Sequence, residues 1–264
     1  MCRFAYYLHR FLLNAKLDIS RFMDEKDLLS IGETAEMLGV SIATLRRWDE
    51  SGRFFSLRDT STGNRRYSRK VVETYLNDLL KIATDWISSG IEIPSMYYCD
   101  NSALFQSRLQ KMQNELINTS DEKIKSIAPL VVAVAGEVGN NSFDHNLGQW
   151  PDIAGIFFGY DLNKRQIVLA DRGQGILQTL KRIRPSLIDD KTALEVAFTE
   201  IISGRDPEER GNGLKFVKSV VIKNLIGLSF QTGNAQLELK RDSSDLNLKL
   251  AQNYYRGCIA SITF

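Results

Sequence analysis

The spacing of apolar and polar residues predicts short helices early in the chain and an alternation of helices and strands later. Apolar side chains recur at helical spacing in residues 30–40, and again in residues 42–50 after a glycine turn. Two short apolar runs, 153–162 and 165–170, have the length and composition of neighbouring strands. The pattern therefore predicts a small helical unit followed by a larger unit that contains a sheet.

The C-terminal part of the chain continues this alternation. Residues 177–202 have a helical pattern that Pro185 interrupts, and residues 214–225 form a second helical stretch. Further strands are predicted near residues 228–232, 235–240 and 257–264. We expect these strands to complete a mixed sheet covered on one face by helices, which makes the fold class α+β.

One helical stretch carries polar residues directly after an apolar run. Glu137, Asn140, Asn141 and Asp144 recur there at helical spacing. A carboxylate and two amides in such a position favour a polar, charged ligand at this face. The alternative is that these residues form the solvated side of an ordinary amphipathic helix.

Three further features follow this helix in order. The strand 165–170 delivers Asp171-Arg-Gly-Gln-Gly175, which puts a carboxylate at a strand end beside backbone that can approach a flat ligand closely. Gly211-Asn-Gly213 then opens a helix, whose free N–H groups and positive dipole end suit phosphates. A later strand supplies Thr232. Each feature alone is weak, but their order predicts a nucleotide site.

With these motifs in this order, residues 121–264 resemble the Bergerat-fold ATPases, a superfamily that includes DNA gyrase B subunits, large heat-shock chaperones, sensor histidine kinases and mismatch-repair ATPases. The resemblance implies a C-terminal α/β sandwich that binds ATP with Mg²⁺. It also implies that Asn141 holds the Mg²⁺, Asp171 accepts the adenine amino proton, and Glu137 is the general base for the attacking water. The implied nucleotide contacts are Asn140, Asn141, Asp144, Asp171, Gly173, Gly175, Gly211, Gly213, Leu214, Lys215 and Thr232.

Some positions resemble different branches of this superfamily. Asp144 fits the branch that hydrolyses ATP, because sensor kinases commonly have a lysine there, whereas His145 resembles the kinase pattern. Hydrolysing members usually receive a phosphate-binding lysine from a following domain, and the candidate here is Lys215 or a lysine of a partner. We therefore expect slow turnover.

The N-terminal helices carry a second resemblance. The first helix ends at Gly39, and Ser41 is placed to cap the helix 42–50, so a tight turn joins the two. Residues 58–67 predict a two-stranded wing that turns at residues 62–64. Together these elements resemble the winged helix-turn-helix of the MerR regulators and their excisionase relatives, notably in the segments Thr-Leu-Arg-Arg-Trp and Gly-Asn-Arg-Arg-Tyr.

This second resemblance implies binding to double-stranded DNA. Arg46 and Arg47 on the second helix can reach base edges or phosphates in the major groove, and arginines of the wing can meet the flanking phosphates. The implied DNA contacts are Thr44, Arg46, Arg47, Arg58, Arg65, Arg66 and Tyr67. Trp48 and Tyr67 are also candidates for packing inside the unit. The alternative partner for the basic face is a protein.

Charge and length are consistent with two units of different kinds. The net charge of the chain is only +2, but residues 41–70 hold eight Lys or Arg and three acidic residues. A chain of 264 residues that is 43% apolar can bury a sizeable core and favours two domains over one. The basic charge of the helix-turn-helix region therefore favours DNA over protein as its partner.

Three segments are expected along the chain. Residues 1–27 form an amphipathic helix, residues 28–90 the winged helix-turn-helix with a following helix, and residues 91–264 the nucleotide-binding domain. The first helix could dock on its own domain, on a second copy of the chain or on a membrane surface. Residues 101–117 have an apolar 4-3-4 spacing, which suits either a twofold homodimer or packing on the sheet of the same chain.

Cysteine usage and hydropathy indicate the compartment. Cys2, Cys99 and Cys258 lack metal or redox spacing, so reduced thiols are expected. No apolar run is long enough to span a membrane, and the first residues do not have the pattern of a secretory signal. The expected location is the cytoplasm, in association with the nucleoid.

The sequence thus predicts a regulatory protein whose grip on DNA or on a partner protein is controlled by bound ATP, with slow hydrolysis. The alternative is a protein kinase of the anti-sigma or histidine-kinase type that acts on a partner. A third reading is a nucleotide domain without activity that serves only as an interaction module.

Overall fold

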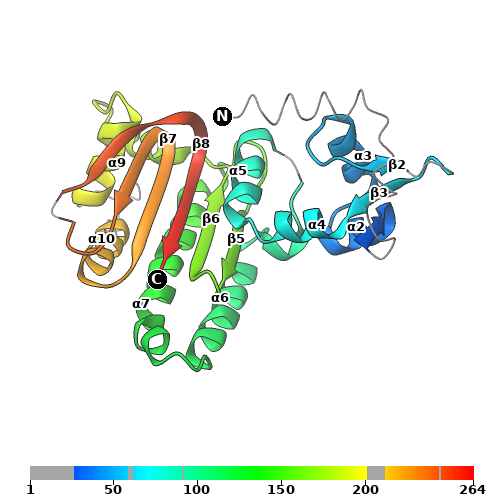
Figure 1. Cartoon of the computed structure of the whole chain (residues 1–264). Coiled ribbons are helices and arrows are strands. Elements are labelled where there is room, and N and C mark those ends of the chain that lie inside the picture. Colours follow the sequence, from blue (N-terminus) through cyan, green and yellow to red (C-terminus); the bar gives the residue numbers. More distant parts are fainter. Residues whose placement is uncertain (1–26, 59–61, 91, 201–211, 244) are drawn as a thin grey trace. The chain divides into compact units, whose positions relative to one another are not determined.

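The chain divides into two compact units, Met1–Leu76 and Asn77–Phe264 (Figure 1). The computed structural model describes residues 27–58, 62–90, 92–200, 212–243 and 245–264. The helix expected in residues 1–27 and the expected contact Gly211 lie outside the described residues, Asp27 excepted. No described helix has the length and apolar character needed to cross a membrane.

The first unit combines three helices with a small antiparallel sheet. Its helices are α2 Ile31–Leu38, α3 Ile42–Glu50 and α4 Arg69–Leu76, and its strands are β1 Leu28–Ser30, β2 Leu57–Arg58 and β3 Arg65–Ser68. The strand order is β1-β3-β2, with both pairs antiparallel. The two predicted helices and the two-stranded wing are confirmed, whereas the pairing of β1 with β3 was not expected.

Local sequence signals set the ends of these helices. Ser30 and Glu33 form a capping box, in which the Glu33 N–H donates to the Ser30 hydroxyl over 3.2 Å and the Ser30 N–H donates to the Glu33 carboxylate over 2.7 Å. Gly39 ends α2 in the left-handed conformation at φ 62°. Ser41 accepts a hydrogen bond from the Thr44 N–H over 3.0 Å and so caps α3, as predicted.

Aromatic side chains form the core of the first unit. Trp48, Phe54, Tyr67 and Tyr75 are all buried, and Phe54 lies 5.8 Å from Tyr67 and 5.4 Å from Tyr75, ring centre to ring centre. Such ring pairs add to the stability that burial alone gives. Trp48 and Tyr67 are therefore packing residues of this unit.

The second unit is a five-stranded sheet with helices packed against it. Its helices are α5 Leu79–Ser89, α6 Ser102–Ile117, α7 Glu122–Asn146, α8 Gly175–Lys181, α9 Asp190–Thr199 and α10 Gly213–Lys223, with the short 3₁₀ helix η3 Ser95–Tyr97. Its strands are β4 Tyr98–Cys99, β5 Ile156–Asp161, β6 Gln166–Asp171, β7 Gly227–Leu239 and β8 Asn247–Thr263.

The sheet is antiparallel, so the prediction of a mixed sheet was wrong. The strand order is β4-β5-β6-β8-β7, and each neighbouring pair runs antiparallel. The two strands predicted near residues 228–240 are one strand, β7, whose pairing with β8 shifts register at Gly233. Gly233 allows this because it takes a φ of 54°, which L side chains rarely adopt.

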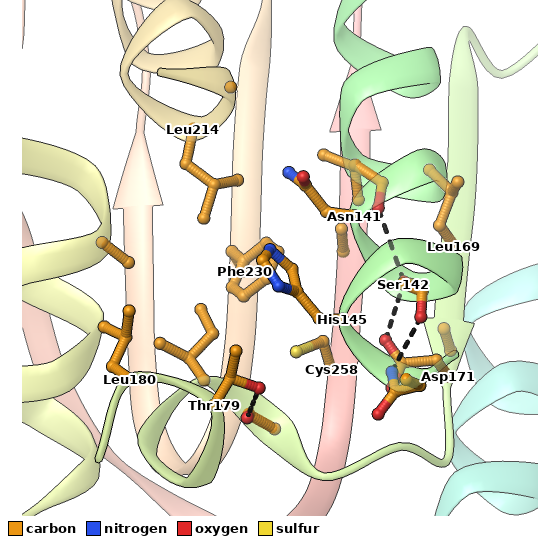
Figure 2. A pocket seen from close by; sticks show the side chains of 18 residues that line it. Asn141, Ser142, His145, Leu169, Asp171, Thr179, Leu180, Leu214, Phe230 and Cys258 are labelled. Carbon is orange, nitrogen blue, oxygen red and sulfur yellow. Dashed lines mark hydrogen bonds between the residues drawn. The ribbon is translucent and has the colours of Figure 1, made fainter. Parts of the chain in front are cut away.

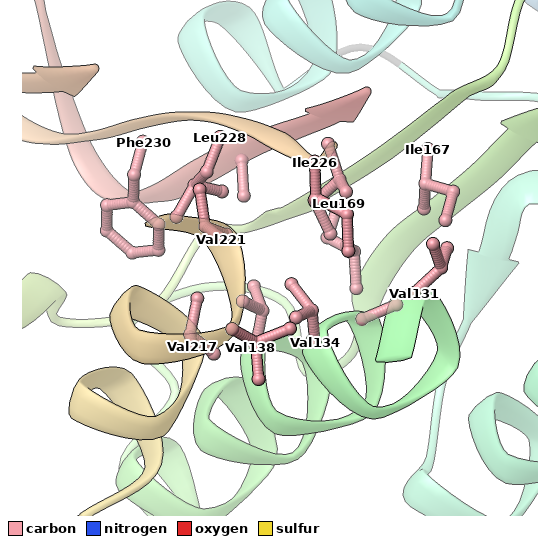
Figure 3. Close-up of a cluster of buried hydrophobic side chains, with 14 of the residues drawn as sticks. Val131, Val134, Val138, Ile167, Leu169, Val217, Val221, Ile226, Leu228 and Phe230 are labelled. Atoms are coloured by element: carbon pink, nitrogen blue, oxygen red, sulfur yellow. The ribbon is translucent and has the colours of Figure 1, made fainter. Parts of the chain in front are cut away.

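The main core lies between one face of this sheet and the helices α6, α7, α9 and α10. Figure 3 shows valines of α7 and α10 meeting aliphatic and aromatic side chains of β6 and β7. The apolar face predicted for residues 101–117 is used here: Phe105, Leu109, Met112 and Leu116 are buried in this same core. Packing within the chain therefore accounts for that spacing, which then gives no separate support for a homodimer.

Helix α5 covers the opposite face of the sheet, so the expectation of helices on one face only was incomplete. Ile156 and Phe158 of β5 belong to the main core, and alternate side chains of a strand point to opposite faces. Gly159 points the other way, where an added Cβ would lie 2.9 Å from the Leu79 side chain of α5. Because α5 packs on this sheet, the two units divide after Leu76 and not near residue 90.

Candidate functional site

A cavity opens between the C-terminal half of α7, the ends of β6 and β8, and the helices α8 and α10 (Figure 2). Its volume is about 100 Å³, several times the roughly 10–15 Å³ that one water molecule needs. Most of its wall is apolar. The lining residues are Val138, Asn141, Ser142, His145, Asn146, Leu169, Ala170, Asp171, Gly175, Ile176, Thr179, Leu180, Ala197, Gly213, Leu214, Phe230, Cys258 and Ala260.

Asp171 is the buried carboxylate of this cavity, at the end of β6 as predicted. It is 2% exposed, and its two oxygens accept hydrogen bonds of 2.8 Å from the Ser142 hydroxyl and the Gly173 N–H. Burial raises the pKa of Asp171, while the hydrogen bonds from Ser142, Gly173 and the backbone of Cys258 lower it. The site therefore holds a hydrogen-bond acceptor at the base of an apolar chamber.

The loop after Asp171 is held in place by close packing. Asn146 accepts a hydrogen bond from the Gln174 N–H over 2.8 Å, and an added Cβ at Gly173 would overlap the Asn146 side chain. Thr232 accepts a hydrogen bond from the Ile176 N–H over 3.2 Å. Thr232 does not line the cavity, so it supports the loop and the start of α8 from behind.

Glu137 and Asn141 lie one turn apart on α7 and face the first residue of α10. A Cβ added at Gly213 would lie 2.5 Å from Glu137 Oε2 and 3.3 Å from Asn141 Nδ2. Close approach of backbone thus explains why this position is glycine. The Nζ atom of Lys215, two residues further on, is buried and has no hydrogen-bond partner within the described part of the chain.

Two of the predicted nucleotide contacts point elsewhere. The Asn140 amide oxygen accepts a hydrogen bond of 2.7 Å from Gln106 Nε2 of α6, and Asp144 is exposed. Neither residue lines the cavity. The face of α7 that lines the cavity differs from the predicted face, because α6 covers the side of α7 that carries Asn140.

Four polar residues of the cavity were not predicted as ligand contacts. Ser142, Asn146, Thr179 and Cys258 all line it, together with His145, which had been considered only as a family feature. Burial lowers the pKa of His145, and Arg182 lowers it further. Ser142 and Asn146 stand four residues apart, so the signal was present as a second polar stripe on α7.

The described residues contain no group of three His, Cys, Asp or Glu side chains that could hold a metal ion. A metal in this cavity would therefore need oxygen atoms from a ligand in addition to the protein. The carboxylate of Glu137 and the amide oxygen of Asn141 are the kinds of donor that suit Mg²⁺.

A second candidate site is the exposed face of α3. Arg46 and Arg47 are exposed, and Arg47 Nη2 donates to Thr44 Oγ1 over 3.1 Å. Thr44 itself is 1% exposed, so it positions Arg47 and is not on the surface. The two arginines can reach outward from a helix whose other side is fixed in the aromatic core.

The wing is tied to α3 through Asp49. Arg65 Nε lies 2.7 Å and Arg58 Nη2 3.2 Å from Asp49 Oδ2, and Ser56 donates to the same carboxylate. Burial raises the pKa of Asp49, but hydrogen bonds from Arg65 and Ser56 outweigh it, so the pKa lies below its usual value. Arg65 thus holds the wing against α3.

The remaining wing residues divide between surface and core. Arg58 is exposed and Arg66 is partly exposed. Tyr67 is 1% exposed and stacks on Phe54, so it is not a surface contact as the sequence had implied. On α3 and the wing, the exposed arginines are therefore Arg46, Arg47 and Arg58.

Two capped helices followed by an antiparallel wing, with exposed arginines on the second helix, define a winged helix-turn-helix unit. A family model described as MerR family regulatory protein matches residues 30–67. This segment is thus a MerR-type DNA-binding domain, which supports a role as a DNA-binding regulator. No curated protein matches the chain.

Proposed function

We propose that this protein is a DNA-binding regulator whose second unit binds an adenine nucleotide in the cavity beside Asp171. The observation that carries the proposal is a carboxylate 2% exposed within an otherwise largely apolar chamber. Each carboxylate oxygen has more than one lone pair, so Asp171 can accept from a ligand in addition to Ser142 and Gly173, and the exocyclic amine of adenine is a donor on a flat apolar ring. The resemblance to Bergerat-fold ATPases, which implies that Asp171 accepts the adenine amino proton, also supports the proposal.

The start of α10 is the proposed position of the phosphates. Its first N–H groups have no side-chain cap from Asn212, and the N-terminal end of a helix attracts anions. The buried ammonium of Lys215 has no partner among the described residues, so a phosphate oxygen would satisfy it. Gly213, the first residue of α10, lines the cavity and is also the residue that Glu137 and Asn141 face.

Magnesium is part of this proposal. Asn141 would hold the ion together with phosphate oxygens, because the protein alone offers too few donors and Mg²⁺ usually takes ligands from the substrate phosphates. Bound there, Mg²⁺ would offset negative charge on the phosphates. Glu137, adjacent to Asn141 on the same face of α7, is the proposed general base that orients a water and takes its proton.

Calorimetry with purified protein tests nucleotide binding. We expect heat from ATP and from ADP in the presence of Mg²⁺, and its loss in Asp171→Asn, which removes the charged acceptor. The matched control is Asp85→Asn, because Asp85 is paired with Lys81 on α5 and lies outside the cavity. Absence of binding by the parent protein at millimolar nucleotide would refute the proposal.

A second assay separates hydrolysis from phosphate transfer. Incubation with ATP labelled at the γ-phosphate should release free phosphate slowly, and Glu137→Gln should stop this while binding persists. Transfer of label to a co-purified protein, without free phosphate, would instead support a kinase. Binding with neither outcome would indicate a nucleotide-gated module without chemistry.

A further inference from the structure

A partly buried arginine lies between the carboxylate of the cavity and the helix on the outer face of the sheet. Arg172 follows Asp171 directly, and its side chain is 17% exposed. Successive residues at the end of a strand point to opposite faces. Asp171 faces the cavity, whereas Arg172 faces α5, so one short segment of backbone carries a group into each environment.

The guanidinium of Arg172 lies at the C-terminal end of α5. Its Nη1 atom donates to the Trp86 carbonyl over 3.4 Å, and its central carbon lies 5.9 Å from the Trp86 ring centre. The Gly90 N–H donates to the same carbonyl, and a Cβ at Gly90 would lie 2.5 Å from Arg172 Nη1. A cation at this end of a helix also interacts favourably with its dipole.

The same arginine is held by the loop that follows α7. Its Nη2 atom is paired with the Asp152 carboxylate, which Arg256 Nη2 also contacts at 2.9 Å. Arg256 further donates to the Arg172 carbonyl over 3.2 Å. The Nε atom of Arg172, in contrast, is buried without a hydrogen-bond partner among the described residues. A small displacement that gives this N–H a hydrogen-bond acceptor would remove the free-energy cost of a buried donor without a partner.

Helix α5 is also the element that leads directly to the DNA-binding unit. Only Asn77 and Asp78 separate it from α4, and Asp78 caps α5 by accepting from the Lys81 N–H over 3.0 Å. Lys164, in the turn between β5 and β6, donates to the Asn77 carbonyl. Both ends of α5 are therefore fastened to the sheet that carries the cavity.

We propose that Arg172 is a relay, which transmits occupancy of the cavity to α5 at its C-terminal end, and that α5 passes the change along its length to the DNA-binding unit, which the chain joins at the N-terminal end of α5. The inference rests on the proposed function, because the signal it transmits is the bound nucleotide. A ligand that bonds to Asp171 shifts the backbone of residues 171–173, and the Arg172 guanidinium moves with that backbone against Trp86 and Gly90.

Hydrogen exchange of the full-length chain tests the relay. Amide exchange is followed in the peptide that covers α5, with and without Mg²⁺-ATP, while calorimetry records nucleotide binding separately. In the parent protein, ATP should change the exchange rate of the amides between Trp86 and Gly90. In Arg172→Gln, and in Asp152→Asn as a milder variant, ATP should still bind but this change should disappear.

A DNA-binding measurement provides the second readout. If the relay operates, ATP should change DNA affinity in the parent by about fivefold or more, and DNA should change ATP affinity by the same factor. In Arg172→Gln, ATP should no longer change the affinity for DNA, and DNA should no longer change the affinity for ATP. Arg165→Gln is the matched control, because Arg165 makes a comparable ion pair of 2.8 Å with Asp121 away from α5, and it should keep the parental ratios.

The outcomes are distinguishable. If the parent protein does not bind nucleotide, both the proposed function and the relay are refuted. If ATP binds the parent but leaves exchange in α5 unchanged, the relay alone is refuted. Persistence of the ATP effect in Arg172→Gln likewise refutes it.

Discussion

The buried carboxylate of Asp171 lowers the stability of the second unit when it is ionised. Burial raises its pKa, so the native state binds this proton more tightly than the unfolded chain. For a carboxylate whose folded pKa is raised, stability falls as pH rises from the unfolded pKa through the folded one, and the loss is complete above it. The charged form of Asp171 therefore costs stability, and this cost grows as pH rises through the folded pKa.

Asp171→Asn should consequently stabilise the second unit while it abolishes nucleotide binding. The expected gain in the free energy of unfolding at pH 7 is about 0.5–2 kcal/mol, as for other substitutions that relieve a strained functional group. Denaturant unfolding at pH 7 and at pH 4 measures it, and the gain should shrink at the lower pH. A loss of stability at pH 7 would contradict this account.

Arg46 is an exposed side chain of α3 that the sequence predicts as a DNA contact. It is exposed on α3, whereas Thr44 of the same helix is buried. Arg46→Ala should weaken binding to a specific DNA site by about 1–3 kcal/mol and reduce the preference for that site over random DNA. Fluorescence anisotropy with both DNAs measures the two effects. An equal loss on both would make Arg46 a phosphate contact instead.

At the scale of elements, the contact between α6 and α7 depends on one glycine. A Cβ at Gly139 would overlap the Phe105 ring, which is fully buried. Gly139→Ala should destabilise the second unit by about 1–3 kcal/mol through overpacking, although alanine is the better helix former by about 1 kcal/mol.

Gly136 offers a matched control on the same helix. A Cβ there would lie 3.3 Å from a terminal methyl group of Leu109, which can move. Gly136→Ala should therefore leave the stability unchanged or raise it slightly. Denaturant unfolding of both variants compares them, and equal destabilisation would mean that helix packing does not distinguish the two positions.

The ion pairs that tie the wing to α3 should make the stability of the first unit depend on pH. The pKa of Asp49 is lowered, so its contribution to stability is present above the unfolded pKa and is lost as pH falls through the folded one. Asp49→Asn should lower the melting temperature of the first unit by about 4–8 °C at pH 7. The difference from the parent should vanish in strong acid, and calorimetry across pH measures it.

The sequence predicted those elements whose signals are local. Gly39 and Ser41 act within a few residues, so the end of α2 and the start of α3 could be placed from these residues alone. Asp171 could be placed because the strand before it is a clear apolar run.

What the sequence did not predict depends on contacts between distant residues. Helix α7 is covered on more than one side, so its polar residues do not form one stripe: Asn140 bonds to Gln106 of α6, whereas Ser142 bonds to Asp171 in the cavity. The burial of Thr44 and Tyr67 likewise depends on tertiary packing. Periodicity identifies the faces of an element, but not which neighbour each one meets.

At the scale of the whole molecule, the position of α5 determines which pieces can fold alone. Its apolar side chains, including Ile82 and Trp86, are buried with α5 on the outer face of the sheet. A fragment of residues 77–264 should therefore be monodisperse and cooperative in thermal unfolding. One of residues 91–264 should aggregate, because Phe157 and Val168 lose their cover. Size-exclusion chromatography with circular dichroism distinguishes the two.

The same feature bears on how such a gene could be assembled and reused. A recombination event that exchanges the recognition module must join the new module at residues 76 and 77, immediately ahead of α5. A junction after α5 would leave the second unit without the helix that covers the outer face of its sheet. Natural or engineered chimaeras should therefore keep α5 with the second unit, whichever DNA-binding unit precedes it.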